Sequence, residues 1–286
     1  MPLWTPSKIS TALWLDGSDA STLFDATTGG SLVAADAGVA RWEDKSGNAR
    51  HVTQATAANR PLRRTNVKNS LDALQFDGTN DILETTFVAF GSSYCFVAVA
   101  VGTNAASSSG AIVATRSKTT GVPVNPQAAY SSGTSQFGVR DDAGNINSNS
   151  MSGVAGATYY LFGGERSGNN VTAYRDGVAG TLGSNSLGTI TATVTSVGAL
   201  YPGSATPNTF LSGHIAEIVF GPVADHVIIE GYLAWKWGMA ASLAGGHAYK
   251  SAAPIVAGSA GRLINGTSLV RPAGIADHSS LIIGAT

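Results

Sequence analysis

Residues 225–237, with the sequence DHVIIEGYLAWKW, are the one clear helical stretch in a chain that otherwise reads as strands and turns. Apolar residues recur in it at spacings of three and four, which places them on one side of a helix. This side consists of Ile228, Tyr232, Trp235 and Met239, flanked by Ile229, Leu233 and Trp237. Asp225 is expected to cap the helix and Gly238 to end it.

The aromatic side chains of this helix carry a large apolar area, so another part of the protein must cover them. We expect Tyr232 and Trp235 to be its buried packing residues. Lys236 falls within the same stripe, and its amine is expected to extend out to solvent. The helix is therefore predicted to cover an open side or end of a β-structure.

The composition is low in charge and rich in small residues. Charged residues make up 12% of the 286 residues, about half of the usual fraction. The formal net charge is -1, which gives no electrostatic reason to expect nucleic acid or an anionic membrane surface as a partner. The 35 glycines indicate many turns. This pattern is typical of an extracellular or virion β-protein rather than of a cytosolic enzyme.

A single cysteine, Cys95, cannot form an internal disulfide and is expected to be buried and inert. The N-terminal sequence MPLWTPSKIS lacks the basic and apolar regions of a signal peptide. No apolar run approaches the roughly 20 residues needed to cross a bilayer. We therefore expect no membrane insertion and no signal-peptide export.

Short apolar or alternating runs bounded by turn residues predict an antiparallel two-sheet sandwich. Strands are predicted at residues 12–15, 71–76, 94–101, 112–115, 137–140, 159–162, 171–175, 190–194 and 216–220. The run 94–101, YCFVAVAV, is apolar on both faces and is expected to be central. Residues 117–134 read as a polar excursion between strands. Asp176 and Gly177 predict a tight hairpin.

The chain is expected to divide near Pro254 into a domain of residues 1–254 and an extension of residues 255–286. The extension has its own β pattern, with a hairpin predicted at Asn265 and Gly266. About thirty residues are too few for an independent core. We therefore expect this β-rich extension to dock on its own domain or on a partner, for attachment or assembly.

Several segments of the chain resemble, in order, the concanavalin A-like (laminin-G-like) jelly-roll domains of bacteriophage and prophage structural proteins. They are LWTPSKISTALWLD (3–16), WEDKSGNARHVTQ (42–54), LQFDGTNDIL (74–83), HIAEIVFG (214–221), IIEGYLAWKWG (228–238) and HAYKSAAP (247–254). The resemblance implies an all-β, antiparallel two-sheet jelly-roll sandwich with one short amphipathic helix near 225–238. It also implies binding of carbohydrate or protein, from a tail fibre, tail tip, baseplate or capsid surface.

One branch of the resembled superfamily hydrolyses glycans with paired carboxylates that alternate along one strand. Retaining hydrolysis needs two carboxyl groups roughly 5 Å apart, and that alternation places them on one face. The glutamates of this chain are Glu43, Glu84, Glu165, Glu217 and Glu230, and none has that spacing. We therefore expect no catalytic residues and no enzymatic activity. Glu217 is expected to point outward from its strand.

Calcium is the one cofactor that the sequence leaves open, since many domains of the resembled family bind it through loop oxygens. The candidate ligands are Asp44, Asn48, Asp77 and Asp81, in two loops of the resembling segments. The alternative, which we prefer, is that these residues only form Asx turns. His247 is expected to be a packing or hydrogen-bonding residue rather than a ligand.

Carbohydrate binding is expected at loops at one end or edge of the sandwich, as the resemblance implies. Aromatic, acidic, amide and arginine side chains cluster at two places along the chain. The first group is Tyr130, Arg140, Asp141, Asp142 and Asn145, and the second is Tyr201 and Asn208. Ordinary surface loops produce such groups readily, so the prediction needs a structural test.

These observations favour a non-enzymatic virion structural protein that displays a lectin-like jelly roll. A tail-fibre, tail-tip or baseplate component that contacts host-surface glycan is the first hypothesis. A capsid decoration protein is the second, and a polysaccharide-degrading hydrolase or a bacterial surface lectin is the third. Expected partners are other virion proteins and further copies of the chain, with a trimer as the first candidate oligomer.

Overall fold

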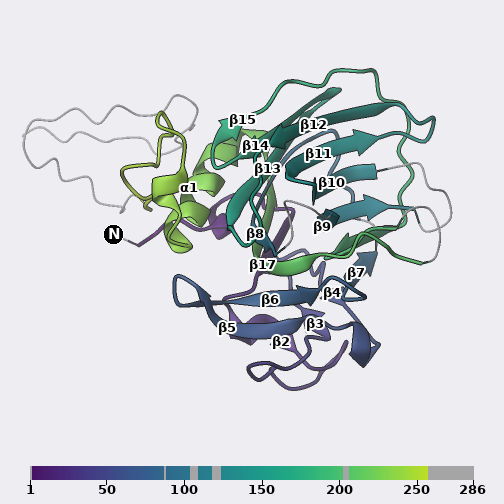
Figure 1. Cartoon of the computed structure of the whole chain (residues 1–286), viewed down its shortest axis with the longest axis vertical. Helices are drawn as coiled ribbons and strands as arrows, with labels where there is room; N and C mark the ends of the chain where they lie inside the picture. The colour runs from purple at the N-terminus through teal and green to yellow at the C-terminus, as the bar shows by residue number, and fades with distance from the viewer. Residues whose placement is uncertain (1, 87, 104–108, 118–123, 202–205, 257–286) are drawn as a thin grey trace, which may run out of the picture.

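The computed structural model describes residues 2–86, 88–103, 109–117, 124–201 and 206–256. They form two antiparallel sheets packed face to face, with the helix α1 (His226–Lys236) outside the first sheet (Figure 1). The predicted all-β sandwich with one short helix near 225–238 is confirmed. Most of the predicted extension, from residue 257 on, lies outside the described residues, as does the predicted hairpin at Asn265 and Gly266.

Each sheet combines strands from distant parts of the chain. In order across the first sheet lie β15 (Val178–Ala179), β14 (Asn170–Arg175), β13 (Tyr160–Ser167), β8 (Ser93–Gly102), β17 (Ser212–Gly221), β6 (Leu71–Asp77) and β5 (Leu62–Lys68), with β1 (Leu13–Asp16) also paired to β17. In order across the second lie β12 (Ile146–Ser152), β11 (Thr134–Arg140), β10 (Val124–Ser131), β9 (Ser109–Arg116), β16 (Val194–Val197), β7 (Leu83–Thr86), β4 (Val52–Thr53), β3 (Arg41–Trp42) and β2 (Leu23–Phe24).

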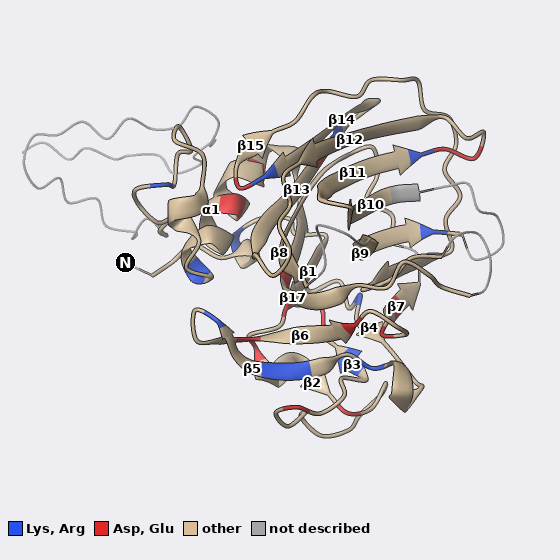
Figure 2. Cartoon of the chain, viewed as in Figure 1, with Lys and Arg blue, Asp and Glu red and all other residues tan. Residues whose placement is uncertain are grey.

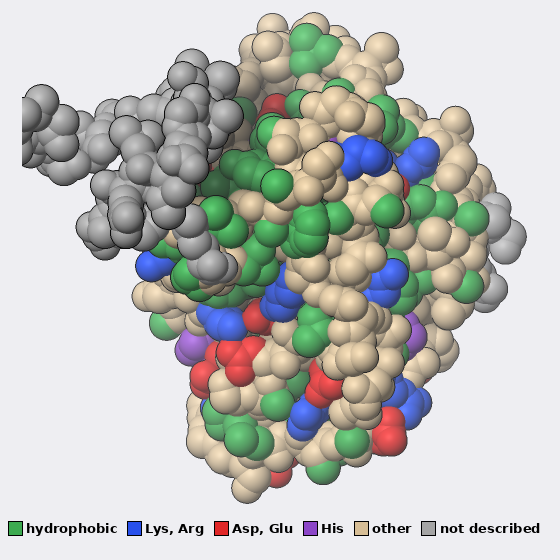
Figure 3. Space-filling view, turned by 90° about the vertical axis from the view of Figure 1, so that its left-hand side faces the viewer, with side chains coloured by type: hydrophobic (Ala, Val, Ile, Leu, Met, Phe, Trp, Pro, Cys, Tyr) green, Lys and Arg blue, Asp and Glu red, His purple; other side chains and the backbone are tan. Residues whose placement is uncertain are grey.

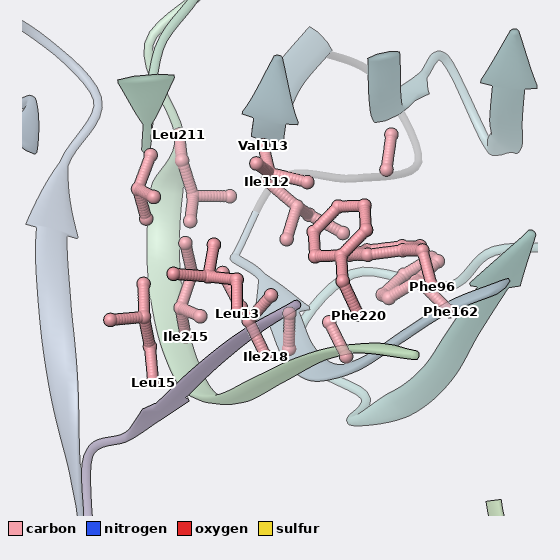
Figure 4. Packing of buried hydrophobic residues seen from close by; sticks show 14 of the residues in the cluster. Leu13, Leu15, Phe96, Ile112, Val113, Phe162, Leu211, Ile215, Ile218 and Phe220 are labelled. Carbon is pink, nitrogen blue, oxygen red and sulfur yellow. The ribbon is translucent and has the colours of Figure 1, made fainter. Parts of the chain in front are cut away.

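The main core lies between the two sheets. Phe96 and Phe220 of the first sheet pack there with ring centroids 5.0 Å apart, near Ile112 of the second (Figure 4). The other face of β8, with Cys95 and Val97, packs in a second apolar cluster that includes α1. β8 is therefore buried on both faces, as its continuous apolar run predicts, and the expected burial of the Cys95 thiol is confirmed.

The helix buries a different stripe from the one predicted. Ile229, Tyr232, Leu233 and Trp237 are buried against the first sheet, whereas Trp235 is 38% exposed. The prediction that Trp235 is buried is wrong, because the covered face is centred on the 229–233–237 row. Figure 3 shows apolar side chains on the side of the molecule that carries α1, where exposed apolar residues of the helix and its surroundings include Val227, Trp235 and Ile255.

The ends of α1 follow the expected signals only in part. Gly238 has a φ of +66°, a conformation that favours glycine and ends the helix. Asp225 occupies the N-cap position, but its side chain makes no capping hydrogen bond. A short 3-10 turn, Val223–Asp225, leads into the helix instead.

Glu217 on β17 forms the polar contact between the helix and the first sheet. Its carboxylate is fully buried and accepts hydrogen bonds from Trp14 Nε1 (2.7 Å), Tyr232 Oη (2.9 Å), Lys236 Nζ (2.6 Å) and Trp237 Nε1 (2.8 Å). Glu217 thus leaves the sandwich core, as expected, but points under the helix rather than to solvent.

The expectation that the amine of Lys236 extends out to solvent is wrong. Its side chain is only 15% exposed and makes ion pairs with Glu217 and with Asp16 Oδ1 (2.7 Å). Burial opposes ionisation of Asp16, but the charges of Lys236 and Lys45 outweigh it and lower the pKa of Asp16. The charge of Lys236 therefore lies between α1 and the first sheet, although tryptophans flank it on both sides in the sequence.

The strand predictions fail where polar residues face the core or where the chain lacks alternation. β10 lies inside the predicted polar excursion, and β5 and β12 are likewise absent from the predicted strands. β12 buries Asn147 and Asn149 between exposed serines, so Met151 is the one apolar residue on its inner face and the strand shows no apolar alternation. The predicted strand at 190–194 contributes only its last residue, to β16. The hairpin at Asp176 and Gly177 is confirmed, since both have positive φ.

The two ends of the described chain pair with each other. Trp4 N donates to Pro254 O (2.8 Å), and Val256 N donates to Pro2 O (3.1 Å). Residues 254–256 therefore belong to the edge formed by the N-terminal segment. Within the described residues, no helix has the length and apolar character required to cross a membrane.

Candidate functional site

The outer face of the second sheet carries a hollow near the ends of β9 and β11, in which polar side chains stand beside a largely apolar lining. Along β11, Phe137 and Val139 are buried toward the core, whereas Gln136 and Arg140 lie on the outer face. Residues paired in register on neighbouring strands share a face, so β9, β10 and β12 extend this surface. The hollow has a volume of about 220 Å³ and is lined by Arg116, Gln127, Gln136, Phe137, Gly138, Val139, Arg140, Ile146 and Ser148.

A second hollow of about 310 Å³ continues the same face toward β16. It shares Arg116, Gln127 and Gln136 with the first hollow and adds Asn208 and Thr209. The two hollows together present guanidinium, amide and hydroxyl groups beside apolar side chains. This is the combination by which a small-molecule site fixes the orientation of a polar ligand.

Arg116 connects the two hollows. Its Nη2 donates to Gln127 Oε1 (2.7 Å), and its Nη1 donates to the backbone oxygen of Tyr201 (2.8 Å). Burial and the nearby charge of Arg140 both lower the pKa of the Arg116 guanidinium. A guanidinium stays protonated despite such a shift, so both arginines contribute positive charge to the hollow.

Of the residues predicted to bind carbohydrate, Arg140 lines the first hollow, and Asn208 and the largely buried Tyr130 line the second. The structure thus brings Arg140 of the first predicted group and Asn208 of the second near one sheet face, on either side of Arg116. This site lies on the face of the sheet, over the strands. The resemblance implied a different place, the loops at one end or edge of the sandwich. Carbohydrate binding by these residues stays a prediction.

The two tyrosines of the predicted carbohydrate-binding groups pack in the interior of the protein. Tyr130 is 1% exposed in the main core, where Gly102 and Gly110 leave room for its ring. Tyr201 is buried in a small cluster with Ile82 and Val194. Neither ring offers an exposed face on which a sugar could stack, because both are covered by the protein's own apolar side chains.

Asp141, Asp142 and Asn145 hold a loop in place. Asp141 accepts hydrogen bonds from the backbone N–H groups of Gly188 (2.7 Å) and Asn145 (2.8 Å), and these lower its pKa. Asp142 accepts from Thr191 N (2.9 Å) and Oγ1 (2.8 Å). These bonds tie residues 141–145 to residues 188–191, beside Arg140.

Sequence reasoning missed Arg116, Gln127, Gln136 and Ser148. The alternation QFGVR at 136–140 marks Gln136 and Arg140 as one face of a strand, and it was a usable signal for that pair. Arg116 directly follows the predicted strand 112–115, but nothing in the sequence indicates that it lies near Arg140. Gln127 lies in the segment predicted to be irregular.

The predicted calcium ligand Asp44 is occupied by donors of the chain itself. Its oxygens accept hydrogen bonds from Trp14 N (2.9 Å), Ser46 N (2.9 Å), Ser46 Oγ (2.7 Å) and Arg50 N (3.1 Å). Asn48 donates its amide to the backbone oxygens of Thr11 (3.0 Å) and Ala12 (3.1 Å). These contacts have the form of the preferred alternative, in which the residues build the turn.

Asp77 and Asp81 close a turn of their own. Asp77 Oδ1 accepts from the N–H groups of Thr79 (2.8 Å) and Asn80 (3.1 Å), while Asp81 Oδ2 accepts from Asp77 N (2.9 Å). Burial and the charge of Asp77 raise the pKa of Asp81 to about 6. In the described part of the chain, no group of three or more His, Cys, Asp or Glu side chains could hold a metal ion. Calcium binding stays an untested prediction.

Two pairs of carboxylates come together in three dimensions, although neither is visible in the sequence spacing. Asp16 and Glu217 are bridged by Lys236, and Glu165 and Glu230 are bridged by His226. Asp16, Glu217 and Glu230 are buried. His247, expected to be a hydrogen-bonding residue, contacts Glu230 with 3.2 Å between Nε2 and Oε2, which confirms that expectation.

No protein-family model matches the chain, and no curated protein matches its sequence. Solved structures do match its fold. The botulinum neurotoxin serotype D binding domain aligns with a TM-score of 0.53 at 8% identity, over 81% of this chain and 51% of that one. The receptor-binding domain of the botulinum neurotoxin C/D mosaic serotype aligns with a TM-score of 0.53 at 10% identity, over 78% and 51%.

A third structure, the binding domain of botulinum neurotoxin DC in complex with SialylT, aligns with a TM-score of 0.50 at 11% identity, over 79% of this chain and 51% of that one. The chain thus spans about half the length of these proteins. At such low identity the likeness extends to the β-sandwich fold alone.

Proposed function

We propose that the chain is a non-enzymatic structural protein of a bacteriophage virion that displays a lectin-like, glycan-binding sandwich. A tail-fibre, tail-tip or baseplate component at the particle surface is the assignment we favour, in contact with other virion proteins. The observation that carries the binding role is the hollow in which Arg116, Gln127, Gln136 and Arg140 stand beside apolar side chains. Its donors and acceptors converge on one open face, as recognition of a many-hydroxyl ligand requires.

The virion assignment is supported by the ordered segments that resemble phage jelly-roll domains and by the low charged fraction of 12%. The binding role has support of another kind. Sandwiches of similar fold serve as binding domains in the botulinum neurotoxins, and one of those structures is a complex with SialylT. We transfer to this chain only the general role of a binding domain. The ligand of the neurotoxin domain is not part of the proposal.

The non-enzymatic role is supported by the surroundings of the carboxylate pairs. Glu217 is fully buried beneath α1, and its oxygens are engaged by four donors. Glu230 is buried between His226 and His247. A glycosidase needs both carboxyl groups open to the sugar and to water, and neither pair offers this.

A glycan array probed with the full chain, followed by a reducing-sugar assay on each bound glycan, tests the binding role. Binding without release of reducing sugar is the expected result. Release of reducing sugar would instead assign the chain to the glycoside hydrolases. Labelling purified particles with an antibody against the chain tests the virion role, and labelled tails are expected. Labelled capsids with no glycan binding would favour a decoration protein.

A further inference from the structure

Two arginines lie at the same end of two strands of the second sheet, with β10 between them. Arg116 of β9 and Arg140 of β11 are both in register with Val124 of β10. Adjacent strands are about 4.8 Å apart, so the two Cα atoms are separated by roughly 10 Å and their side chains share the outer face. The ends of β9 and β11 are both blue in Figure 2, at one side of the sheet.

Among the described residues, no acidic side chain forms an ion pair with either guanidinium. Arg116 donates to two neutral oxygens, those of Gln127 and of the Tyr201 backbone. The Arg140 guanidinium makes no hydrogen bond or ion pair with any described residue. The Nε atoms of both arginines are buried and have no partner in the described part of the chain. A buried donor without an acceptor destabilises the protein, and an acceptor group of a ligand would remove that cost.

The nearest acidic residues along the chain are committed to other bonds. Asp141 accepts from Gly188 and Asn145, and Asp142 accepts from Thr191. The first hollow therefore combines two positive charges, unmatched donors and room for a ligand. A neutral sugar would satisfy the donors but would leave the charges of Arg116 and Arg140 uncompensated.

We infer that this hollow holds the anionic group of an acidic glycan, a carboxylate or a sulfate, between Arg116 and Arg140. A guanidinium presents planar, paired donors that match such an anion. Gln127, Gln136 and Ser148 line the same hollow and can bond sugar hydroxyls. The volume of about 220 Å³ fits one terminal sugar residue, and the adjoining hollow of about 310 Å³ receives the next. The inference rests on the proposed glycan-binding role.

The test measures binding of the full chain, in a buffer free of phosphate and sulfate, to matched ligands: lactose, sialyllactose and 3′-sulfated lactose, and each acidic array glycan beside its uncharged parent. We expect at least one acidic ligand to bind about ten-fold or more tightly than its parent. Arg116→Gln and Arg140→Gln should each remove most of this preference. Which acidic ligand is favoured distinguishes carboxylate from sulfate recognition.

Arg64→Gln is the matched control, because Arg64 lies on β5 of the other sheet and pairs with Asp36. It should bind acidic ligands as the unaltered protein does. Arg140→Lys keeps the charge and should retain part of the preference, and thermal melts confirm that each variant folds. Equal binding of acidic ligands and their parents would overturn the inference and leave the glycan-binding role standing. Unchanged binding in both glutamine variants would also overturn it, and no binding to any glycan would overturn both proposals.

Discussion

Glu217 is the residue on which the attachment of α1 to the first sheet depends most. Trp14 Nε1, Trp237 Nε1 and Lys236 Nζ can only donate hydrogen bonds, so the carboxylate must accept from all three. Burial and the charge of Asp16 raise the pKa of Glu217, but these donors favour its ionised form. A neutral side chain of the same shape would leave Lys236 and an indole without their acceptor.

The substitution Glu217→Gln should therefore destabilise the protein by about 3 kcal/mol, the usual cost of removing one partner of a buried ion pair. Urea unfolding followed by tryptophan fluorescence measures the change. Glu43→Gln is the control, because Glu43 is partly exposed beside Arg41, and it should cost less than about 1 kcal/mol. Equal costs for the two substitutions would show that the Glu217 contacts do not stabilise the helix attachment.

At the candidate site, the sequence predicts some of the polar residues that line the hollows, but it does not predict which side chains are exposed. Arg140 and Asn208 are polar members of the two groups predicted to bind carbohydrate, and both line the hollows. Tyr130 and Tyr201 belong to the same predicted groups, but both rings are buried. Exposure of a tyrosine depends on packing between sheets, and sequence alone does not contain that information.

At the scale of the element, α1 was predictable and its orientation was not. The three- and four-residue spacing gave a helix within a residue or two of its bounds. The apolar residues surround more than half of the helix, so the pattern did not distinguish the buried row 229–233–237 from the row containing Trp235. Lys236 decided the orientation, because its charge pairs with Glu217, which is distant in sequence.

The start of α1 carries a second polar cluster, which makes stability depend on pH. His226 is buried, with its Nδ1 2.7 Å from Glu165 Oε1 and its Nε2 3.4 Å from Glu230 Oε1. Burial lowers the pKa of His226, but Glu165 and Glu230 outweigh it and raise the pKa from 6.5 to about 9. Burial raises the pKa of Glu230, but His226 and His247 lower it from 4.5 to about 2.

The directions of these two pKa shifts define the pH range in which the cluster stabilises the protein most. The stabilisation from His226 is complete below pH 6.5 and is lost as the pH rises through about 9. The stabilisation from Glu230 is complete above pH 4.5 and is lost as the pH falls through about 2. The contribution of the cluster to the free energy of unfolding should therefore be greatest between these limits and should fall by about 3 kcal/mol above pH 9.

Chemical unfolding between pH 6 and 10 checks this prediction. His226→Gln should flatten the decline between pH 6.5 and 9. Asp225→Asn, at the neighbouring position, should leave the decline unchanged, because a carboxyl group does not titrate in that range. A decline of the same size in His226→Gln would assign it to other groups.

At the scale of the whole molecule, the order of segments predicted the sandwich because alternation and turn residues are local signals. The pairing of β1 and β6 with the same strand, β17, has no such signal. The division of the chain was predicted after residue 254, whereas residues 254–256 bond to residues 2–4. A truncation should therefore be made after Val256.

A chain that ends at Val256 is expected to fold with a melting temperature within about 2–4 °C of the full chain, since its described contacts are retained. The predicted role of the extension in assembly implies that this shorter chain no longer forms the oligomer. Thermal melts and light scattering measure the two properties. An unfolded product would show that the extension belongs to the core, and an intact oligomer would show that assembly does not use it.

The central claim is that the outer face of the second sheet is the ligand-binding surface. A crystal structure of the full chain with its best array glycan tests this most directly. The account predicts the sugar over β9, β10 and β11, with its polar groups on Arg116, Arg140 and Gln127. Another hollow, of about 430 Å³, lies at the loops that contain Ser10, Ser46 and Asn48. A sugar bound there, with the face of the second sheet empty, would contradict the account.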